Sequence, residues 1–190
     1  MTHASAVATL KDAFPSDVTG TVEFRGEQTV EVTKAGLSAV LRHCKEALGF
    51  DGLVDITTID HSGRDPRFEV VYELYSYAAN LSLRVKSATA EDDAEFPSAA
   101  SIWPGANWHE REAYDMMGVR FAGHPDLRRI LMWEGYPFFP LRKEFPLAGK
   151  ASEMPDVAFT AAAPLQGGPF VTGPGANEET VAREPRARGE

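Results

Sequence analysis

Acidic, basic and histidine side chains are concentrated in one segment, NWHEREAYDMMGVRFAGHPDLRRI at positions 107–130. Its His109-Glu110 pair matches the start of the His-Glu-x-x-His motif, in which two histidines one helical turn apart hold zinc. Ala113 stands where the second histidine belongs, so that motif is incomplete. His109 and Glu112 also have the i, i+3 spacing of di-iron sites, but such sites need a second helix of the same kind, and the chain has no second copy. We therefore expect no metal here.

Glu112 and Asp115 share a helical face, and two such carboxylates can do general acid–base chemistry if burial raises one pKa. A free-standing hydrolase is therefore one hypothesis. Carboxylates on a helix are more often neutralised by arginines, and Arg111 is spaced to pair with Asp115 at i, i+4. Arg128 and Arg129 follow after a turn. We expect an ion-pair network that joins this helix, Glu110 included, to the segment HPDLRRIL.

His124 precedes Pro125 and Asp126, which form turns, so we expect it to fix the loop rather than to transfer protons. Arg142 and Lys143 form a second small basic pair, interpreted as a salt-bridging surface. The sequence has no glycine-rich dinucleotide motif, phosphate loop or nucleophile elbow. These absences argue against a bound nucleotide, flavin or covalent intermediate. The region is rich in Trp, Tyr and Phe, which are enriched at protein interfaces.

The elements that must position this segment can be predicted from periodicity. Val7, Leu10 and Phe14 have helical spacing, and Pro15 ends that helix. Alternating residues on both sides of Gly26 predict a hairpin. An amphipathic helix is predicted from residue 34 to 48, with Gly49 as its left-handed cap.

Three further runs, GLVDITTID, RFEVVYELYSY and LSLRVKS, predict strands in antiparallel order, and the short AAN segment predicts a hairpin turn. A helix is then predicted near Asn107 to Met117, before Gly118. Helices before and after the strands indicate an α+β fold, a mostly antiparallel sheet flanked by helices with a long irregular C-terminal arm.

The 190 residues fit one domain, predicted over residues 1–150, followed by a Pro/Gly/Ala-rich tail over residues 151–190. The tail cannot form its own core, and we expect it to order across a partner's surface. A formal net charge of -9 argues against nucleic acid or anionic lipid as the main partner. No secretion signal or transmembrane run is visible, so we expect a cytoplasmic protein that meets a membrane only through a partner.

Cys44 is the single cysteine, which excludes an internal disulfide and a four-thiolate iron–sulfur cluster on this chain. It lies on the helical face of Leu37, Val40, Leu41 and Leu48. We therefore expect Cys44 to be a buried small hydrophobe rather than a nucleophile.

The stretches ANWHEREAYDMMGVRFAGHPDLRRIL and PLRKEFPLAGK resemble a known family, the thirty-kilodalton or C subunit of respiratory complex I, the proton-pumping NADH:quinone oxidoreductase. The positions that fit its signature are Glu110, Arg111, Glu112, Asp115, His124, Arg128 and Ile130. The chain departs from the family where Phe138-Phe139 replaces the usual Gly-His pair before Pro140, and where Glu144 replaces an aspartate.

The resemblance implies a subunit without a redox centre, with FMN, iron–sulfur clusters and quinone held by partner subunits. It implies a place on the cytoplasmic face of the cell membrane, against the forty-nine-kilodalton-type quinone-site subunit and near the iron–sulfur subunits, and through them the membrane arm. The charged residues would then lock a helix–turn substructure and present part of it to neighbours. Related subunits also serve membrane-bound hydrogenases and complexes fed by other donors such as ferredoxin, so the electron donor stays open.

Overall fold

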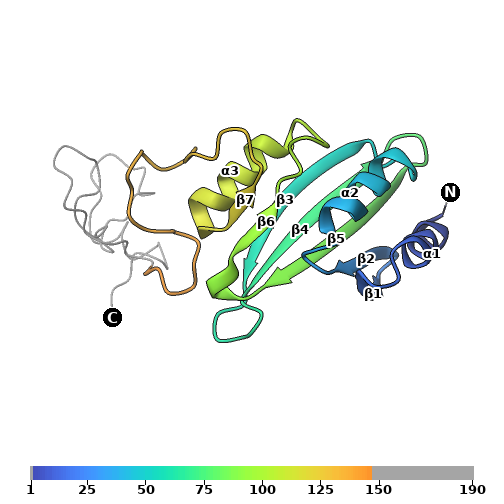
Figure 1. The fold of residues 1–190 in the computed structure, drawn as a ribbon, viewed down its shortest axis with the longest axis horizontal. Coiled ribbons are helices and arrows are strands. Elements are labelled where there is room, and N and C mark those ends of the chain that lie inside the picture. Colours follow the sequence, from blue (N-terminus) through green and yellow to red (C-terminus); the bar gives the residue numbers. More distant parts are fainter. Residues whose placement is uncertain (1, 147–190) are drawn as a thin grey trace, which may run out of the picture. The chain divides into compact units, whose positions relative to one another are not determined.

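The structure, a computed structural model, describes residues 2–146 (Figure 1). The predicted tail over residues 151–190, and the domain boundary before it, lie outside the described residues. The N-terminal helix α1 (His3–Ala13) begins at Thr2, whose side-chain oxygen accepts a hydrogen bond from the Ser5 N–H at 3.2 Å. The Ser5 hydroxyl also accepts a bond from the Thr2 N–H, so the two residues form a reciprocal capping box at the start of the helix. Pro15 follows its end, as predicted.

The predicted hairpin is confirmed as β1 (Val18–Phe24) and β2 (Glu27–Val32), paired antiparallel. Its turn uses Arg25 and Gly26, both at positive φ, which suits a two-residue hairpin. Helix α2 (Leu37–Glu46) is shorter than the predicted 34–48. The reason is local: the Thr33 hydroxyl accepts a bond from the Gly36 N–H at 3.1 Å and holds residues 33–36 in a turn.

The predicted antiparallel strands are confirmed as β3 (Gly52–Asp60), β4 (Phe68–Ser76) and β5 (Leu81–Thr89). The hairpin joins them through a parallel pairing of β2 with β5, which gives a five-stranded sheet in the order β1-β2-β5-β4-β3. No periodicity in the sequence specified that pairing, since it joins segments that are distant along the chain. The α+β class with a mostly antiparallel sheet is confirmed.

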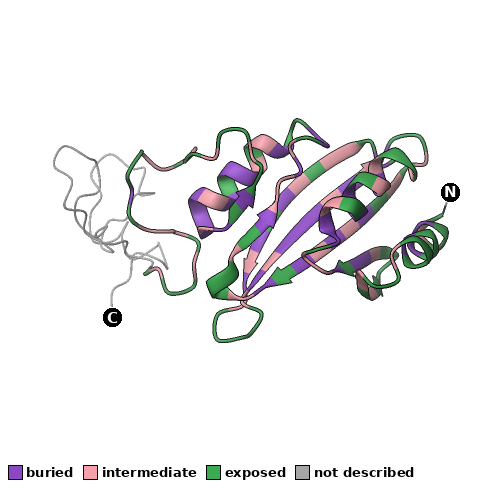
Figure 2. Cartoon of the chain, viewed as in Figure 1, coloured by how far each residue is buried: buried purple, intermediate pink, exposed green. Residues whose placement is uncertain are grey.

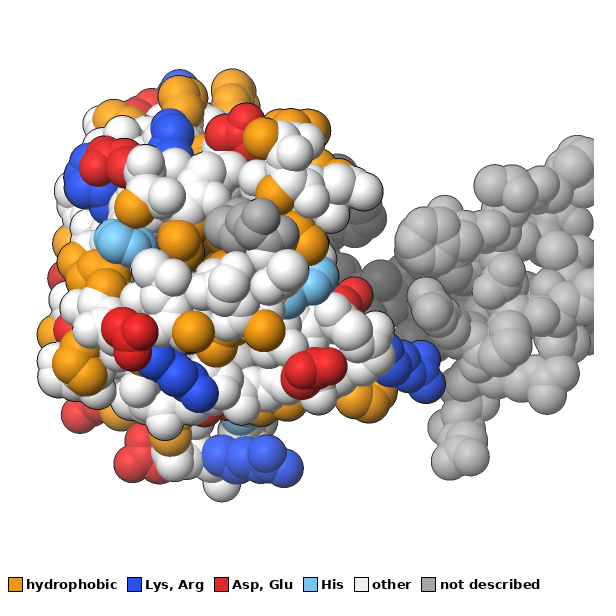
Figure 3. All heavy atoms as spheres, turned by 90° about the vertical axis from the view of Figure 1, so that its right-hand side faces the viewer, with side chains coloured by type: hydrophobic (Ala, Val, Ile, Leu, Met, Phe, Trp, Pro, Cys, Tyr) orange, Lys and Arg blue, Asp and Glu red, His pale blue; other side chains and the backbone are white. Residues whose placement is uncertain are grey.

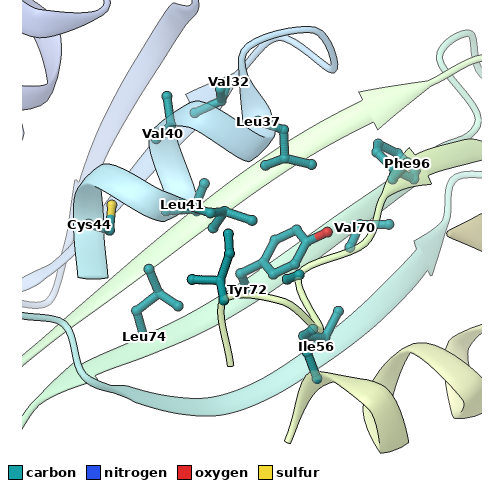
Figure 4. Close-up of a cluster of buried hydrophobic side chains, with 14 of the residues drawn as sticks. Val32, Leu37, Val40, Leu41, Cys44, Ile56, Val70, Tyr72, Leu74 and Phe96 are labelled. Carbon is teal, nitrogen blue, oxygen red and sulfur yellow. The ribbon is translucent and has the colours of Figure 1, made fainter. Parts of the chain in front are cut away.

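The core lies between one face of this sheet and α2. Figure 4 shows Leu37 and Leu41 of the helix lying over Tyr72 of β4, and Cys44 belongs to the same buried cluster. Buried positions alternate along β5, whereas three consecutive residues of β4, Val70 to Tyr72, are buried (Figure 2). The predicted burial of Cys44 is confirmed, and this burial raises the pKa of its thiol to about 12.

The opposite face of the sheet carries paired charges. Arg84 of β5 bonds to Glu73 of β4 and to Glu27 of β2, and Lys86 contacts Glu69 at 3.2 Å. Figure 3 views the end that carries α1, where acidic, basic and hydrophobic side chains are interspersed. At this end of the described chain, such mixing leaves no broad basic patch of the kind that binds nucleic acid.

The charged segment of the sequence lies in a small unit beside the main sheet. A 3-10 turn (Glu91–Asp93) leads to β6 (Glu95–Pro97), which pairs in parallel with β7 (Arg120–Ala122). Helix α3 (Ala106–Met117) connects the two strands and packs against the edge strand β3. None of the described helices is long and apolar enough to cross a membrane.

Gly118 ends α3 in the left-handed conformation, at φ 75°. A Cβ added there would lie 2.7 Å from the Phe139 ring and 2.7 Å from the Arg142 guanidinium. Gly49 has a similar φ of 72° with open space around it. We expect Gly118→Ala to lower the free energy of unfolding by about 2 kcal/mol and Gly49→Ala by only about 1 kcal/mol, measured by chemical denaturation. Equal losses of free energy in the two variants would show that Phe139 and Arg142 can move aside for the added methyl group without destabilising the fold.

Candidate functional site

Asp115 organises the segment that follows α3. Its side chain is completely buried, and Oδ2 accepts hydrogen bonds from the N–H groups of Ile130, Leu131 and Met132 at 3.0, 2.7 and 2.8 Å. Burial by itself raises the pKa of Asp115, but these bonds and one from Arg129 outweigh it and leave the pKa below its usual value. The carboxylate is therefore ionised at neutral pH and fully occupied by its own chain.

Arg129 completes this arrangement from the loop. Its Nη1 lies 2.5 Å from Asp115 Oδ1 and donates to the Asp115 carbonyl at 2.9 Å. Its Nη2 donates to the carbonyls of Tyr136 and Phe138 at 2.6 and 3.2 Å. One guanidinium thus joins the end of α3 to two later points of an irregular segment, which uses the planar set of donors that arginine offers.

Arg111 holds the same loop with the opposite charge. Its Nε and Nη2 donate to the carbonyls of Arg128 and Arg129 at 3.1 and 3.0 Å. Helical spacing allowed a pair between Arg111 and Asp115, but Arg111 turns to the loop backbone and Asp115 binds Arg129 instead. The carbonyls of residues 128 and 129 thus accept bonds from Arg111, and the N–H groups of residues 130–132 donate to Asp115. Two side chains of α3 therefore satisfy both kinds of backbone group in a segment without regular structure.

Glu110 is the third buried charged residue of α3 and reaches the opposite way. Its two oxygens accept bonds from the Ser98 hydroxyl and the Ala99 N–H, both at 2.6 Å. Burial raises the pKa of Glu110 to about 7, although both hydrogen bonds favour the ionised form. The hydroxyl of Tyr72 is buried without a partner among the described residues, and burial together with the charge of Glu110 raises its pKa. A titratable pair thus lies where α3 meets the sheet.

His124 adds a third group to this cluster from the loop after β7. Its Nε2 lies 3.9 Å from Glu110 Oε2 and 3.1 Å from the carbonyl of Asn107, and the side chains of His124 and Glu110 are fully buried. Its Nδ1 accepts a bond from the Asp126 N–H at 3.0 Å. These contacts suit a ring that carries its proton on Nε2. The histidine bonds to the backbone on both sides, as expected for a residue that fixes a loop.

The other predicted site residues lie outside this buried set. Arg128 is 61% exposed and pairs with Asp126 at 2.8 Å. Glu112 and Lys143 are exposed. Glu112 and Asp115 thus occupy different environments, one in solvent and one buried, although helical spacing puts them on one side of α3. The structure does not unite the two carboxylates that the hydrolase hypothesis needs.

Arg142 lies against the end of α3 and donates to the carbonyl of Met117 at 2.7 Å. Its guanidinium is 4.6 Å from the centroid of Phe139, and that of Arg129 is 5.2 Å from the same ring. Phe139 therefore lies within cation–π range of both arginines.

His109 contacts Asp55 of β3, with Nδ1 3.0 Å from the carboxylate. In the described part of the chain no three His, Cys, Asp or Glu side chains cluster closely enough to hold a metal. Sequence reasoning missed Asp55, Tyr72 and Ser98 as partners of the α3 residues. Asp55 and Tyr72 lie in strands distant from α3 in sequence, and nothing in their local pattern indicated a contact with that helix. Ser98 stands directly after a strand, where a hydroxyl often caps a turn.

Comparison with known proteins finds a family and solved structures that this chain resembles. The family model described as "Respiratory-chain NADH dehydrogenase, 30 Kd subunit" matches residues 30–151. The C subunit of the NADH-quinone oxidoreductase of Geotalea uraniireducens (strain Rf4) is 44% identical over 148 residues, which is 78% of this chain and 90% of that protein. A trypsin-resistant fragment of Nqo5 superimposes with a TM-score of 0.56 at 30% identity, over 64% of this chain and 99% of the fragment.

A chain in the structure of the membrane-bound sulfane sulfur reductase, an archaeal respiratory membrane complex, has the same fold, with a TM-score of 0.64 at 24% identity. That match covers 76% of this chain and 85% of the other. At this identity the likeness concerns the fold alone. The family model covers well over half of the chain, and together with the relative from Geotalea it leads to one conclusion: the chain belongs to the family of the 30 kDa subunit of respiratory-chain NADH dehydrogenase.

Proposed function

We propose that this chain is a cofactor-free scaffold in the peripheral arm of a proton-translocating NADH:quinone oxidoreductase. In this role it holds the quinone-site subunit and the iron–sulfur subunits in position, and through them the membrane arm. The observation that carries the proposal is that the buried charged side chains of α3 bond to other segments of the same chain. Glu110, Arg111 and Asp115 all bond to segments of their own chain, which makes a rigid surface out of an irregular loop.

The reaction then belongs to the assembly. Electrons pass from NADH through FMN and iron–sulfur clusters to quinone, and these groups are held by partner subunits. The donor set of this chain supports that division: its one cysteine is buried with a raised pKa, and thiolates are the usual ligands of iron–sulfur clusters. Both oxygens of Asp115 are engaged by its own chain rather than directed at a substrate. We infer a non-catalytic subunit.

We place the subunit on the cytoplasmic face of the cell membrane, attached through partners. A second candidate is the same scaffolding role in a complex with another electron donor, such as a membrane-bound hydrogenase or a ferredoxin-fed complex. The shared fold of the sulfane sulfur reductase chain favours keeping this candidate. The hydrolase hypothesis has less support, because Glu112 is exposed and Asp115 is buried.

The test is affinity purification of the tagged full chain from gently solubilised membranes, with mass spectrometry and a quinone-reduction assay. The expected result is recovery of the quinone-site, iron–sulfur and membrane subunits together with NADH-dependent quinone reduction. The same partners without NADH-dependent activity would favour a different donor. Recovery of the chain alone from the soluble fraction would contradict the scaffold role.

A further inference from the structure

A small pocket of about 80 Å³ opens between α3 and the edge strand β3. Asp55 and Thr57 of the strand line it, together with Glu112 and Met116 of the helix and Leu141 of the following segment. Cofactor and metabolite sites usually enclose about 300 Å³ or more, whereas a volume of about 80 Å³ has room for a few water-sized groups. The size of this pocket therefore suits the end of one long side chain rather than a small-molecule ligand.

The charge of the pocket indicates which side chain. Glu112 is exposed, and among the described residues no ion pair or hydrogen bond involves its carboxylate. The side chain of Asp55 is about half exposed, and among the described residues its carboxylate forms an ion pair only with the His109 ring. Beside Glu112, the helix contributes the apolar side chains of Ala113 and Met116 to the lining. Carboxylates beside an apolar wall fit a lysine or arginine, whose aliphatic stem packs while its cationic head remains paired.

The margins of the pocket have the character of a protein interface. Trp108 is 60% exposed and stands one helical turn before Glu112, on the same side of α3. Leu141, which lines the pocket, is 54% exposed. The Arg111 guanidinium lies 5.2 Å from the Trp108 ring centroid and limits its movement. Exposed tryptophan beside charged groups is typical of residues that dominate binding energy.

We propose that this pocket receives a lysine or arginine side chain from a neighbouring subunit of the respiratory complex, with Glu112 and Asp55 as its counter-charges and Trp108 packed over its stem. The inference rests on the proposed scaffold function and specifies one contact of it. Charge complementarity selects the occupant: the chain has a net charge of -9, and both carboxylates line the same pocket.

The first experiment uses cells that lack this chain, supplied with the tagged full chain as wild type or as a variant. Glu112→Lys is expected to reduce the yield of assembled complex about tenfold, and Glu112→Gln about threefold, since opposed or missing charge at an interface weakens association. The matched control is Asp12→Lys, an exposed acid of α1, expected to change the yield less than about twofold. Unchanged thermal midpoints of the purified variants would show that folding is intact.

The second experiment identifies the occupant. A photo-reactive benzoylphenylalanine replaces Trp108, and as a control it replaces Tyr77, which is 72% exposed at the end of β4. The expected product links position 108 to a peptide of another subunit that contains lysine or arginine. Full assembly of Glu112→Lys, or a link to a segment without a basic residue, would overturn the inference while leaving the scaffold function in place. If wild-type chain recovers no partner, the scaffold function fails, and the inference fails with it.

Discussion

Asp115→Ala is expected to lower the free energy of unfolding of the full chain by about 4 kcal/mol, the largest single loss we anticipate. The substitution leaves three backbone N–H groups and the Arg129 guanidinium without their shared acceptor. Arg129 would then be a largely buried cation without this counter-ion, and such a charge is costly because water cannot replace the lost partner. The loop after β7 should loosen first.

Chemical denaturation of the purified chain measures this loss, and hydrogen exchange of the amides of residues 130–132 reports on the loop directly. Glu112→Ala is the matched control, because it removes an exposed carboxylate from the same helix and should change stability by less than about 0.5 kcal/mol. Because the pKa of Asp115 lies below its usual value, the contribution of its ionised form is present at neutral pH and disappears only in acid. Equal effects of the two substitutions would contradict the proposed role of Asp115.

Glu110→Gln is expected to change the pH dependence of stability. Burial raises the pKa of Glu110 from 4.5 to about 7, so the folded chain binds a proton that the unfolded chain releases between these values. The stability contributed by this proton is fully present below pH 4.5 and is lost as the pH rises through about 7. Across that window the wild type should lose about 3 kcal/mol relative to the glutamine variant.

The measurement is a series of denaturation curves for both proteins between pH 4 and pH 8. Only the difference between them counts, because the other ionisable groups, including His124 at 3.9 Å and Tyr72 of β4, are present in both. Glu112→Gln serves as the control and should follow the wild type at every pH, since its carboxylate is exposed. If the difference in free energy of unfolding between wild type and Glu110→Gln did not change with pH, the ionised Glu110 carboxylate would be tolerated in its buried position.

The local elements could be predicted because their causes are local. Apolar spacing defines α1, α2 and the three antiparallel strands, and Gly49 and Gly118 end their helices where a left-handed residue is needed. Some boundaries were wrong, as where Thr33 delays the start of α2. The short strands β6 and β7 were not predicted at all. The segment with Glu110 and Asp115 also stood out from sequence alone, because acidic, basic and histidine residues are concentrated in it.

What the sequence by itself determined is the main helices and strands, the buried cysteine and the family. The tertiary structure decided the rest: the parallel pairing of β2 with β5, the approach of Tyr72 and Asp55 to α3, and the choice of Arg129 over Arg111 as the partner of Asp115. Helical spacing indicates which side chains can come into contact, but it does not determine which partner each side chain bonds. That choice depends on which backbone groups of a distant loop remain unpaired, and only the folded chain brings those groups within reach.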